Sequence, residues 1–239
     1  ITIEVTTRDG MIAKTYTLSV TRLPSAVATL SGLTPNLGIL SPAFSSTTTA
    51  YTASVPNNAT SIRLTPTATD SAAVIKVNGS VVASGANSAS IPLAVGINTI
   101  TIMVIAQDGK TIKTYIVKIT RAASSVATLS GLALRGVILS PAFDNSQTTY
   151  TAKVAKSTNS LKVKPTATSS AATIKVNGTS VVSGSLSKPI TLKIGKNVIK
   201  VVVTAQNGAA KTYKITVTRG PVAKLAPFPG IFQSPIQNR

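Results

Sequence analysis

The side chains of this chain most able to act on a ligand are basic. Lys and Arg number 24 against five Asp and Glu, His and Cys are both absent, and the net charge is +19. Without His a Ser-His-Asp triad cannot form, and without Cys the chain has neither thiolate metal ligands nor disulfides. The acids are scattered and form no DxD pattern: Glu4, Asp9, Asp70, Asp108 and Asp144. We therefore expect no enzymatic activity, no calcium or other metal site and no cofactor.

The positive charge is concentrated in residues 122–219, which carry a net +12, whereas residues 23–121 carry +4. In "LKVK", Lys162 and Lys164 alternate with apolar residues, so a strand places both on one face. One hypothesis is an adhesin-type module that binds anionic glycans or cell surfaces through release of counterions. The residues assigned to this role are Lys153, Lys156, Lys162, Lys164, Lys193 and Lys200.

A plainer interpretation is that lysines on strand faces keep the protein soluble and prevent unwanted pairing of strand edges. Specific recognition of nucleic acid is not expected, because stacking of bases needs exposed aromatic residues among the basic ones. Residues 122–219 offer only Phe143, Tyr150 and Tyr213. We also expect no membrane span, since no apolar run is long enough to cross a bilayer.

The elements that must position these lysines repeat along the chain. "VATLSGL" begins at Val27 and Val126, "LSPAF" at Leu40 and Leu139, and "KVNG" at Lys76 and Lys175, each pair separated by 99 residues. This self-similarity divides the sequence into four parts. They are a partial repeat at 1–22, full repeats at 23–121 and 122–219, and a Pro-containing tail at 220–239.

Each full repeat is expected to consist of short strands, because β-branched residues dominate its apolar positions and alternate with polar ones. In the first copy the expected strands are 27–33, 50–55, 61–67, 74–77, 80–83, 90–94, 99–106 and 112–120. Asn78-Gly79 and Asn177-Gly178 predict two-residue type I′ hairpin turns, and Asp108-Gly109 and Asn207-Gly208 predict the same before the closing strand. The expected fold class is all-β, with tandem immunoglobulin-like antiparallel β-sandwiches.

The order of motifs is itself informative. In the first full repeat it reads "ATLSGL … LSPAF … YTASV … PTAT … KVNG … INTITIMVIAQDG … KTYIVKITR", and the second repeat follows the same order. This order resembles the cadherin-like β-sandwich repeats of bacterial secreted and surface proteins. The resemblance implies an immunoglobulin-like fold, placed in tandem in extracellular or cell-surface proteins, without chemistry of its own.

The two ends of the sequence match parts of a repeat. Residues 1–22 align with Ile100–Arg121, which are only the last two strands, and "VAKL" at Val222–Leu225 echoes the "VATL" of a first strand. A lone two-stranded hairpin is marginally stable at best, so we expect it to need a partner surface. The residues expected at this interface are Ile12, Tyr16, Leu18, Val20, Val222, Leu225, Phe228, Ile231 and Phe232.

The leading hypothesis is therefore a structural subunit of an extracellular bacterial fibre or surface array. The tail of one chain would add a strand to the hairpin of the next, and such a head-to-tail contact propagates as a polymer. The alternative is that the chain is a window of a longer tandem array. Both interpretations remain open at this point.

Overall fold

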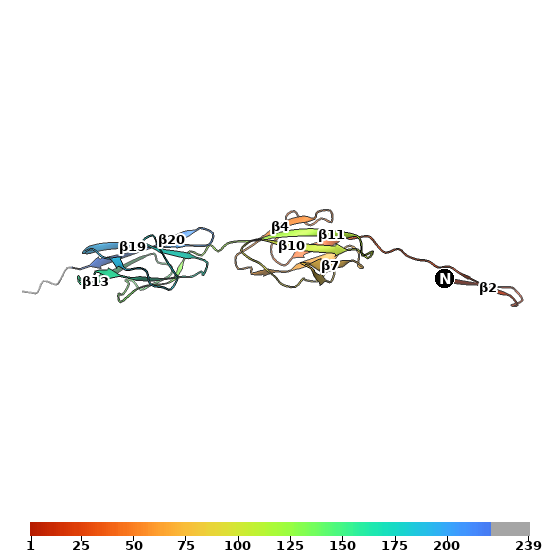
Figure 1. Ribbon diagram of the computed structural model, residues 1–239, viewed down its shortest axis with the longest axis horizontal. Helices are drawn as coiled ribbons and strands as arrows, with labels where there is room; N and C mark the ends of the chain where they lie inside the picture. Colours follow the sequence, from red (N-terminus) through yellow and green to blue (C-terminus); the bar gives the residue numbers. More distant parts are fainter. Residues whose placement is uncertain (221–239) are drawn as a thin grey trace, which may run out of the picture. The chain divides into compact units, whose positions relative to one another are not determined.

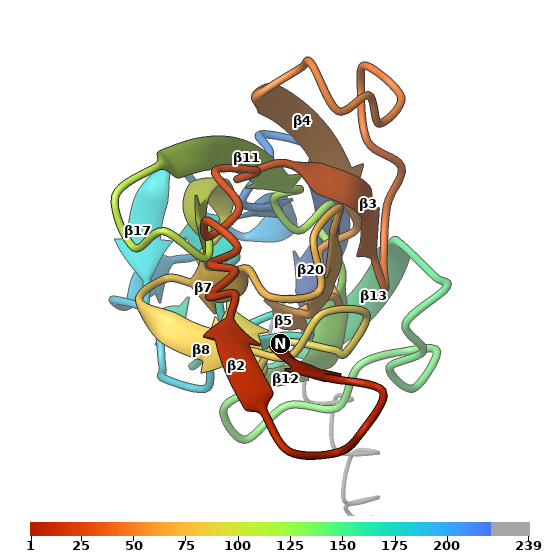
Figure 2. The same ribbon diagram turned by 90° about the vertical axis from the view of Figure 1, so that its right-hand side faces the viewer.

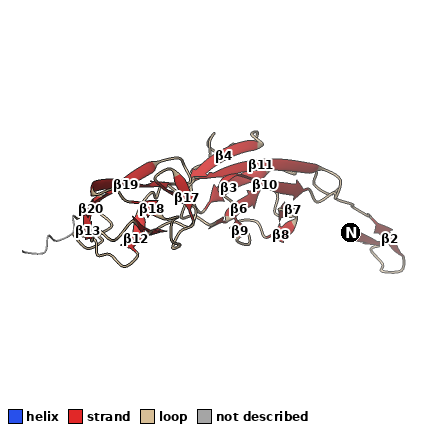
Figure 3. Cartoon of the chain, turned by 60° about the vertical axis from the view of Figure 1, so that its left-hand side comes forward, coloured by secondary structure: helices blue, strands red, loops and turns tan. Residues whose placement is uncertain are grey.

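The structure is a computed structural model that describes residues 1–220. In this part of the chain every regular element is a strand (Figure 3). The chain divides into two compact units, the first formed by Ile1–Ala123 and the second beginning at Ser124.

The first unit begins with a two-stranded hairpin, drawn in red in Figure 2. Its strands are β1 (Thr2–Thr6) and β2 (Ala13–Thr17). They pair antiparallel, with Ile3 opposite Tyr16. Alternation of apolar and polar residues over "ITIEV" and "AKTYTL" explains the strands, because it places the apolar side chains of both on one face.

The rest of the first unit is a sandwich of two layers. One layer is a five-stranded sheet in the order β4-β11-β10-β7-β8, in which β4, β11, β10 and β7 lie side by side (Figure 1). The other layer consists of the pairs β3-β6 and β5-β9. The bounds are β3 (Leu30–Pro35), β4 (Ala50–Val55), β5 (Ser61–Ile62), β6 (Leu64–Ala68), β7 (Val74–Val77), β8 (Ser80–Val82), β9 (Ile91–Pro92), β10 (Gly96–Ile105) and β11 (Ile112–Arg121).

The second unit repeats this arrangement strand for strand. Its five-stranded sheet has the order β13-β20-β19-β16-β17, and its other layer consists of β12-β15 and β14-β18. The bounds are β12 (Leu129–Leu134), β13 (Thr149–Val154), β14 (Ser160–Leu161), β15 (Val163–Ala167), β16 (Thr173–Val176), β17 (Thr179–Val181), β18 (Ile190–Thr191), β19 (Gly195–Thr204) and β20 (Ala210–Arg219). The predicted all-β immunoglobulin-like fold is confirmed.

Each unit has its own apolar core between the two layers. In β10 and β11 the apolar residues that face inward are fully or almost fully buried, and they alternate with more exposed ones, as the period of two requires. Tyr115 and Tyr213 are completely buried, and each hydroxyl accepts a hydrogen bond from a backbone N–H, at 3.0 Å from Leu30 and Leu129 respectively. The tyrosines thus satisfy a polar group of the first strand inside the core.

One pairing was not visible in the sequence. β4 runs parallel to β11, with Ala50 beside Ile116 and Val55 beside Arg121, and β13 pairs with β20 in the same way. Partners so far apart in the sequence leave no local pattern from which their direction can be read. The start of β4 therefore lies beside the middle of β11, and both strands end at the same edge of the sheet.

The turns agree with the prediction at one position and differ at another. Asn78 and Gly79 both have positive φ, 46° and 85°, as a type I′ turn requires, and Asn177-Gly178 does the same. The expectation of a similar two-residue turn was wrong at both Asp108-Gly109 and Asn207-Gly208, because in each pair only the glycine has positive φ. Ala106 donates to the carbonyl of Thr111 across a longer loop, in which only Gly109 has positive φ. The Asp108 carboxylate accepts the backbone N–H groups of Lys110 and Thr111, which stabilises this longer loop.

Candidate functional site

The hairpin β1–β2 exposes an apolar face that a closely related sequence buries in β10 and β11. Six of its apolar positions are 49–74% exposed: Ile1, Ile3, Val5, Tyr16, Leu18 and Val20. Their counterparts in β10 and β11 are at most 1% exposed: Ile100, Ile102, Val104, Tyr115, Val117 and Ile119. The face is therefore built like one wall of a sandwich core, without the opposing layer against it.

The structure places the predicted interface residues of the first part of the chain on or next to this face. Tyr16 lies in β2, Ile12 directly before the strand, and Leu18 and Val20 directly after it, and all four are exposed. Lys14 Nζ lies 5.3 Å from the centre of the Tyr16 ring. The other predicted members, Val222, Leu225, Phe228, Ile231 and Phe232, lie outside the described residues.

Sequence reasoning missed three residues of this face. Ile1, Ile3 and Val5 belong to it through the register that pairs Ile3 with Tyr16 and Val5 with Lys14. The alternation in "ITIEV" was the available signal, since it puts these three side chains on the same side as Tyr16 once the hairpin forms.

In each unit, hydrogen bonds fix the incoming chain at the loop before the closing strand. In the first unit Gln107 Oε1 accepts the N–H of Ser25 at 3.0 Å, and Asp108 N–H donates to the carbonyl of Ser25 at 3.1 Å. In the second unit Gln206 and Asn207 hold Ser124 in the same manner. The chain therefore enters each unit beside the loop that precedes the closing strand.

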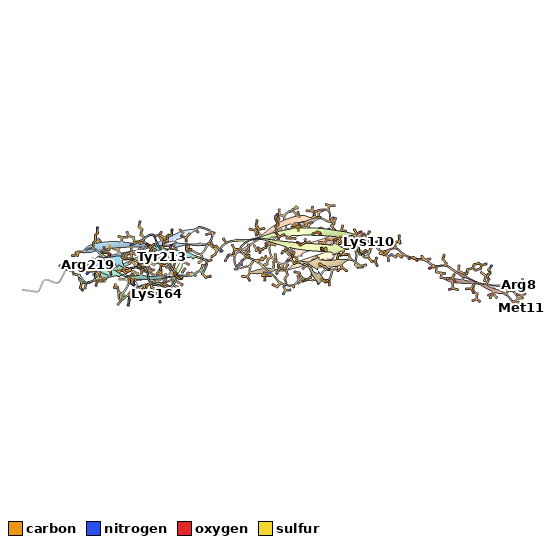
Figure 4. All side chains as sticks on the ribbon, viewed as in Figure 1. Arg8, Met11, Lys110, Lys164, Tyr213 and Arg219 are labelled. Atoms are coloured by element: carbon orange, nitrogen blue, oxygen red, sulfur yellow. The ribbon has the colours of Figure 1, made fainter. Side chains whose placement is uncertain are left out.

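An arginine fixes the outgoing chain at the other end of the closing strand. The guanidinium of Arg121 donates to the carbonyls of Asn57, at 2.9 and 2.6 Å, and Leu93, at 2.8 Å. Arg219, at the far end of β20 (labelled in Figure 4), does the same with the carbonyls of Lys156 and Leu192. Each unit thus receives the chain at one end of its closing strand and releases it at the other.

The predicted lysines are distributed over both layers of the second unit. Lys153 in β13 and Lys200 in β19 face outward from the five-stranded sheet. Lys164 in β15 is exposed on the other layer (Figure 4), and the half-buried Lys162 directly precedes the same strand. Lys156 and Lys193 lie in connections, after β13 and before β19. The six residues therefore do not form one surface.

Two of the acids, Asp108 and Asp144, are held by hydrogen bonds within their own loops. Hydrogen bonds from Thr111, by its side chain and then its N–H, hold the pKa of Asp108 below its usual value. Bonds from the side chain and the N–H of Ser146 do the same for the pKa of Asp144. Within residues 1–220 no three metal-ligating side chains come together. This part of the chain also contains no helix that is long and apolar enough to cross a membrane.

The family described as Cadherin-like beta sandwich domain matches residues 29–122 and 127–220. The chain belongs to this family. The two cadherin-like domains account for the two full sandwiches, and the resemblance inferred from the motifs is confirmed.

Other proteins are similar to this chain in sequence or in structure. A protein of Evansella cellulosilytica named "Putative membrane protein" is 39% identical over 84 residues, which are 35% of this chain and 13% of that protein. The chain thus spans only a small part of this relative. Titin domains Z1Z2 in complex with telethonin cover 80% of this chain at 11% identity and a TM-score of 0.34, with 98% of that chain covered. Mouse clustered PcdhgC3 EC1-3 covers 92% at 10% identity and a TM-score of 0.31, with 76% of that chain covered.

Proposed function

We propose that the chain is a non-enzymatic structural segment of an extracellular bacterial fibre or surface array. The observation that carries this proposal is the path of the chain through each cadherin-like domain. It is fixed by hydrogen bonds at one end of the closing strand and by the Arg121 or Arg219 guanidinium at the other. Domains that receive and release the chain at opposite ends suit a role as spacers in series.

The pairing of the strands suits the same role. Tension on a domain acts on Arg121 at the end of β11 and, once β3 has separated from β6, on the start of β4 at Ala50. Because β4 and β11 are parallel, this tension pulls the two strands past each other and loads their hydrogen bonds together. Loading the bonds together resists separation more than opening them one at a time.

Single-molecule stretching tests this role. Pulled by its two ends, the chain is expected to yield in two separate steps, each releasing roughly 300 Å of polypeptide as about 90 residues extend. The control is attachment through Ile97→Cys and Thr120→Cys, which are paired across β10 and β11 and whose bonds open one by one. The control should open at clearly lower force. Equal forces in the two geometries would contradict the structural role.

We further propose that the apolar face of the hairpin is covered by residues 221–239 of a second copy, so that copies assemble end to end. In both domains the N–H of the leucine in "VATL" donates to the tyrosine hydroxyl of the closing strand. Tyr16 is the counterpart of that tyrosine in the hairpin, and Leu225 is the last residue of "VAKL". The same leucine-to-tyrosine contact would then form between copies, with the tail of one copy packed across the apolar face of the other, as β3 packs across the closing strands.

Sedimentation equilibrium of the 239-residue chain tests the assembly. The test variant Tyr16→Asp/Leu18→Asp places two charges on the apolar face, and its matched control Thr15→Asp/Thr17→Asp places two on the opposite face of the same segment. We expect the control to associate with rising concentration as the unmodified chain does, and the test variant to remain monomeric. An unmodified chain that is monomeric at all concentrations would refute the proposed end-to-end assembly while leaving the spacer role intact.

A second candidate function is adhesion to anionic glycans or cell surfaces through the second domain. The observation that favours it is the net charge of +12 in residues 122–219 against +4 in residues 23–121. The two domains, produced separately, should differ in retention on a carboxylated polysaccharide column, and modest salt should release the second. Equal retention of the two domains would remove the basis of this candidate.

A further inference from the structure

The five-stranded sheet of the second domain carries five lysines on its outer face. The side chains of these strands alternate between the core and solvent, and the inward ones on β19 and β20 are buried Ile, Val and Tyr residues. All five outward lysines are exposed. They are Lys153 in β13, Lys175 in β16, Lys196 and Lys200 in β19, and Lys214 in β20.

The register brings these charges close to one another. Lys200 lies directly opposite Lys214 on the neighbouring strand, and Lys196 and Lys153 lie on either side of Thr218. Strands are spaced about 4.8 Å apart, so the lysines flanking Thr218 are separated by two such spacings, about 10 Å at their Cα atoms. Like charges in facing positions are unfavourable for the fold, which makes this arrangement costly unless something negative binds to it.

The protein supplies no such negative charge on this face. Between residues 122 and 220 the one acidic residue is Asp144, and its carboxylate accepts the N–H of Ser146 at 2.8 Å in the loop before β13. The positive charge of the face is therefore left to be balanced by ions from solvent or by an anionic ligand.

The matching face of the first domain is different. At the five corresponding positions it has one lysine, Lys76, and the other four are Ser54, Ile97, Thr101 and Ile116. A further lysine, Lys118, occupies the position of Thr216. The fold is the same in both domains, so the additional lysines are not required to form it.

The remaining residues of the face indicate what kind of anion it suits. Threonines lie between the lysines, among them Thr151, Thr216 and Thr218, whose hydroxyls can bond sugar hydroxyls and carboxylates. Tyr150 and Tyr213 are buried and offer no platform on which a nucleic-acid base could stack. Lysine and threonine without exposed aromatics favour an acidic polysaccharide over single-stranded nucleic acid.

A hollow beside β13 extends this face at its edge. It has a volume of about 630 Å³, and its lining includes Val137, Ile138, Ser140, Thr158 and Lys153, the last of which also belongs to the lysine face. In the first domain Gly38 takes the place of Val137, and it packs so tightly that an added Cβ would lie 3.0 Å from the carbonyl oxygen of Ser54. The valine cannot repeat this approach, because its side chain would occupy that space.

We propose that the outer face of β13, β20, β19 and β16 binds a linear acidic polysaccharide, with Lys153, Lys196, Lys200 and Lys214 as its principal contacts and the hollow beside β13 as the place for a sugar ring. This inference rests on the second candidate function and assigns it to one surface. It differs from the sequence-based hypothesis, because Lys162, Lys164 and Lys193 lie elsewhere and have no part in it.

The experiment compares two triple variants of the 239-residue chain that lose the same charge. The face variant is Lys153→Thr/Lys196→Thr/Lys200→Thr, and the control is Lys162→Thr/Lys164→Thr/Lys193→Thr. Threonine is favourable in strands, and circular dichroism with thermal unfolding checks that both variants fold. Binding to sodium alginate is measured by calorimetry at several salt concentrations, with neutral dextran and single-stranded DNA as comparison ligands.

We expect the face variant to bind alginate about tenfold more weakly or worse, with a shallower salt dependence, and the control to stay within about twofold of the unmodified chain. An equal loss in both variants would overturn the assignment to this face while the adhesin function stands. If the unmodified chain fails to bind alginate at low salt, the adhesin function itself fails. Tighter binding to the DNA than to alginate would overturn the choice of ligand.

Discussion

The hairpin β1–β2 and the closing hairpin β10–β11 have closely related sequences and opposite environments. Both form the same antiparallel register, which pairs Ile3 with Tyr16 in one and Ile102 with Tyr115 in the other. Tyr16 is 50% exposed, whereas Tyr115 is completely buried. The sequence of a hairpin thus specifies its pairing and its apolar face, while burial of that face depends on the layer packed against it.

The largest difference in unfolding free energy between the two hairpins should come from replacing the corresponding isoleucines with alanine. Ile102→Ala removes a fully buried side chain from the core of the first domain and should lower its free energy of unfolding by about 2–5 kcal/mol. Ile3→Ala, at the corresponding place in the hairpin, should change it by no more than about 0.5 kcal/mol. Urea unfolding followed by circular dichroism measures both. Similar losses in the two variants would show that the hairpin face is buried in the isolated molecule.

Removal of a tyrosine hydroxyl should also lower stability in the closing hairpin and not in β1–β2, but by less than the isoleucine substitution. Tyr115→Phe leaves the N–H of Leu30 without its buried partner, which should cost about 1–3 kcal/mol in the stability of the first domain. Tyr213→Phe should do the same in the second domain through Leu129. Tyr16→Phe is the matched control in the hairpin, and in dilute solution its effect on unfolding should be close to zero.

The arginine that ends each closing strand provides a third comparison. Arg121→Lys keeps the charge but loses the planar guanidinium that donates to the carbonyls of both Asn57 and Leu93. We therefore expect the free energy of unfolding, measured with heat or urea, to fall by about 1 kcal/mol. Arg22→Lys changes the corresponding residue after the hairpin and serves as the control. An equally stable Arg121→Lys variant would mean that the arginine does not fix the outgoing chain.

Acid pH should produce the smallest effect, and it should distinguish the two domains. Because hydrogen bonds lower the pKa of Asp108 in the folded state, its carboxylate stabilises the first domain above about pH 4. This contribution is lost as the pH falls through the lowered pKa. The second domain has Asn207 at the same place, so Asp108→Asn should weaken the acid sensitivity of the first domain without changing that of the second. Unfolding midpoints between pH 5 and pH 2 test this.

The fold was largely predictable because its signals are local. Alternation of apolar and polar residues located the strands, and Asn78-Gly79 specified its turn because both residues tolerate positive φ. The turn at Asp108 was not predictable from the dipeptide alone, because its side-chain bonds to Lys110 and Thr111 favour a longer loop. The parallel pairing of β4 with β11 was also invisible, since it depends on contacts distant in the sequence.

The candidate surfaces were less predictable than the fold. Sequence comparison singled out Lys153 and Lys200 but grouped them with Lys164, which lies on the other layer. Sequence comparison did not identify Lys214, although it is paired with Lys200 on the neighbouring strand. Membership of a surface depends on which strands pair and in which register, and a comparison of aligned residues carries no information about neighbours on adjacent strands.

Hydrogen exchange in the hairpin, measured as a function of protein concentration, shows whether a second copy covers its apolar face. We expect the amides of β1 and β2 to exchange rapidly in dilute solution and to become protected as copies associate. The amides of β10 and β11 should be protected at every concentration. Slow exchange in β1 and β2 of the dilute monomer, or exchange that remains rapid at the highest concentration, would contradict the proposal that a second copy completes this hairpin.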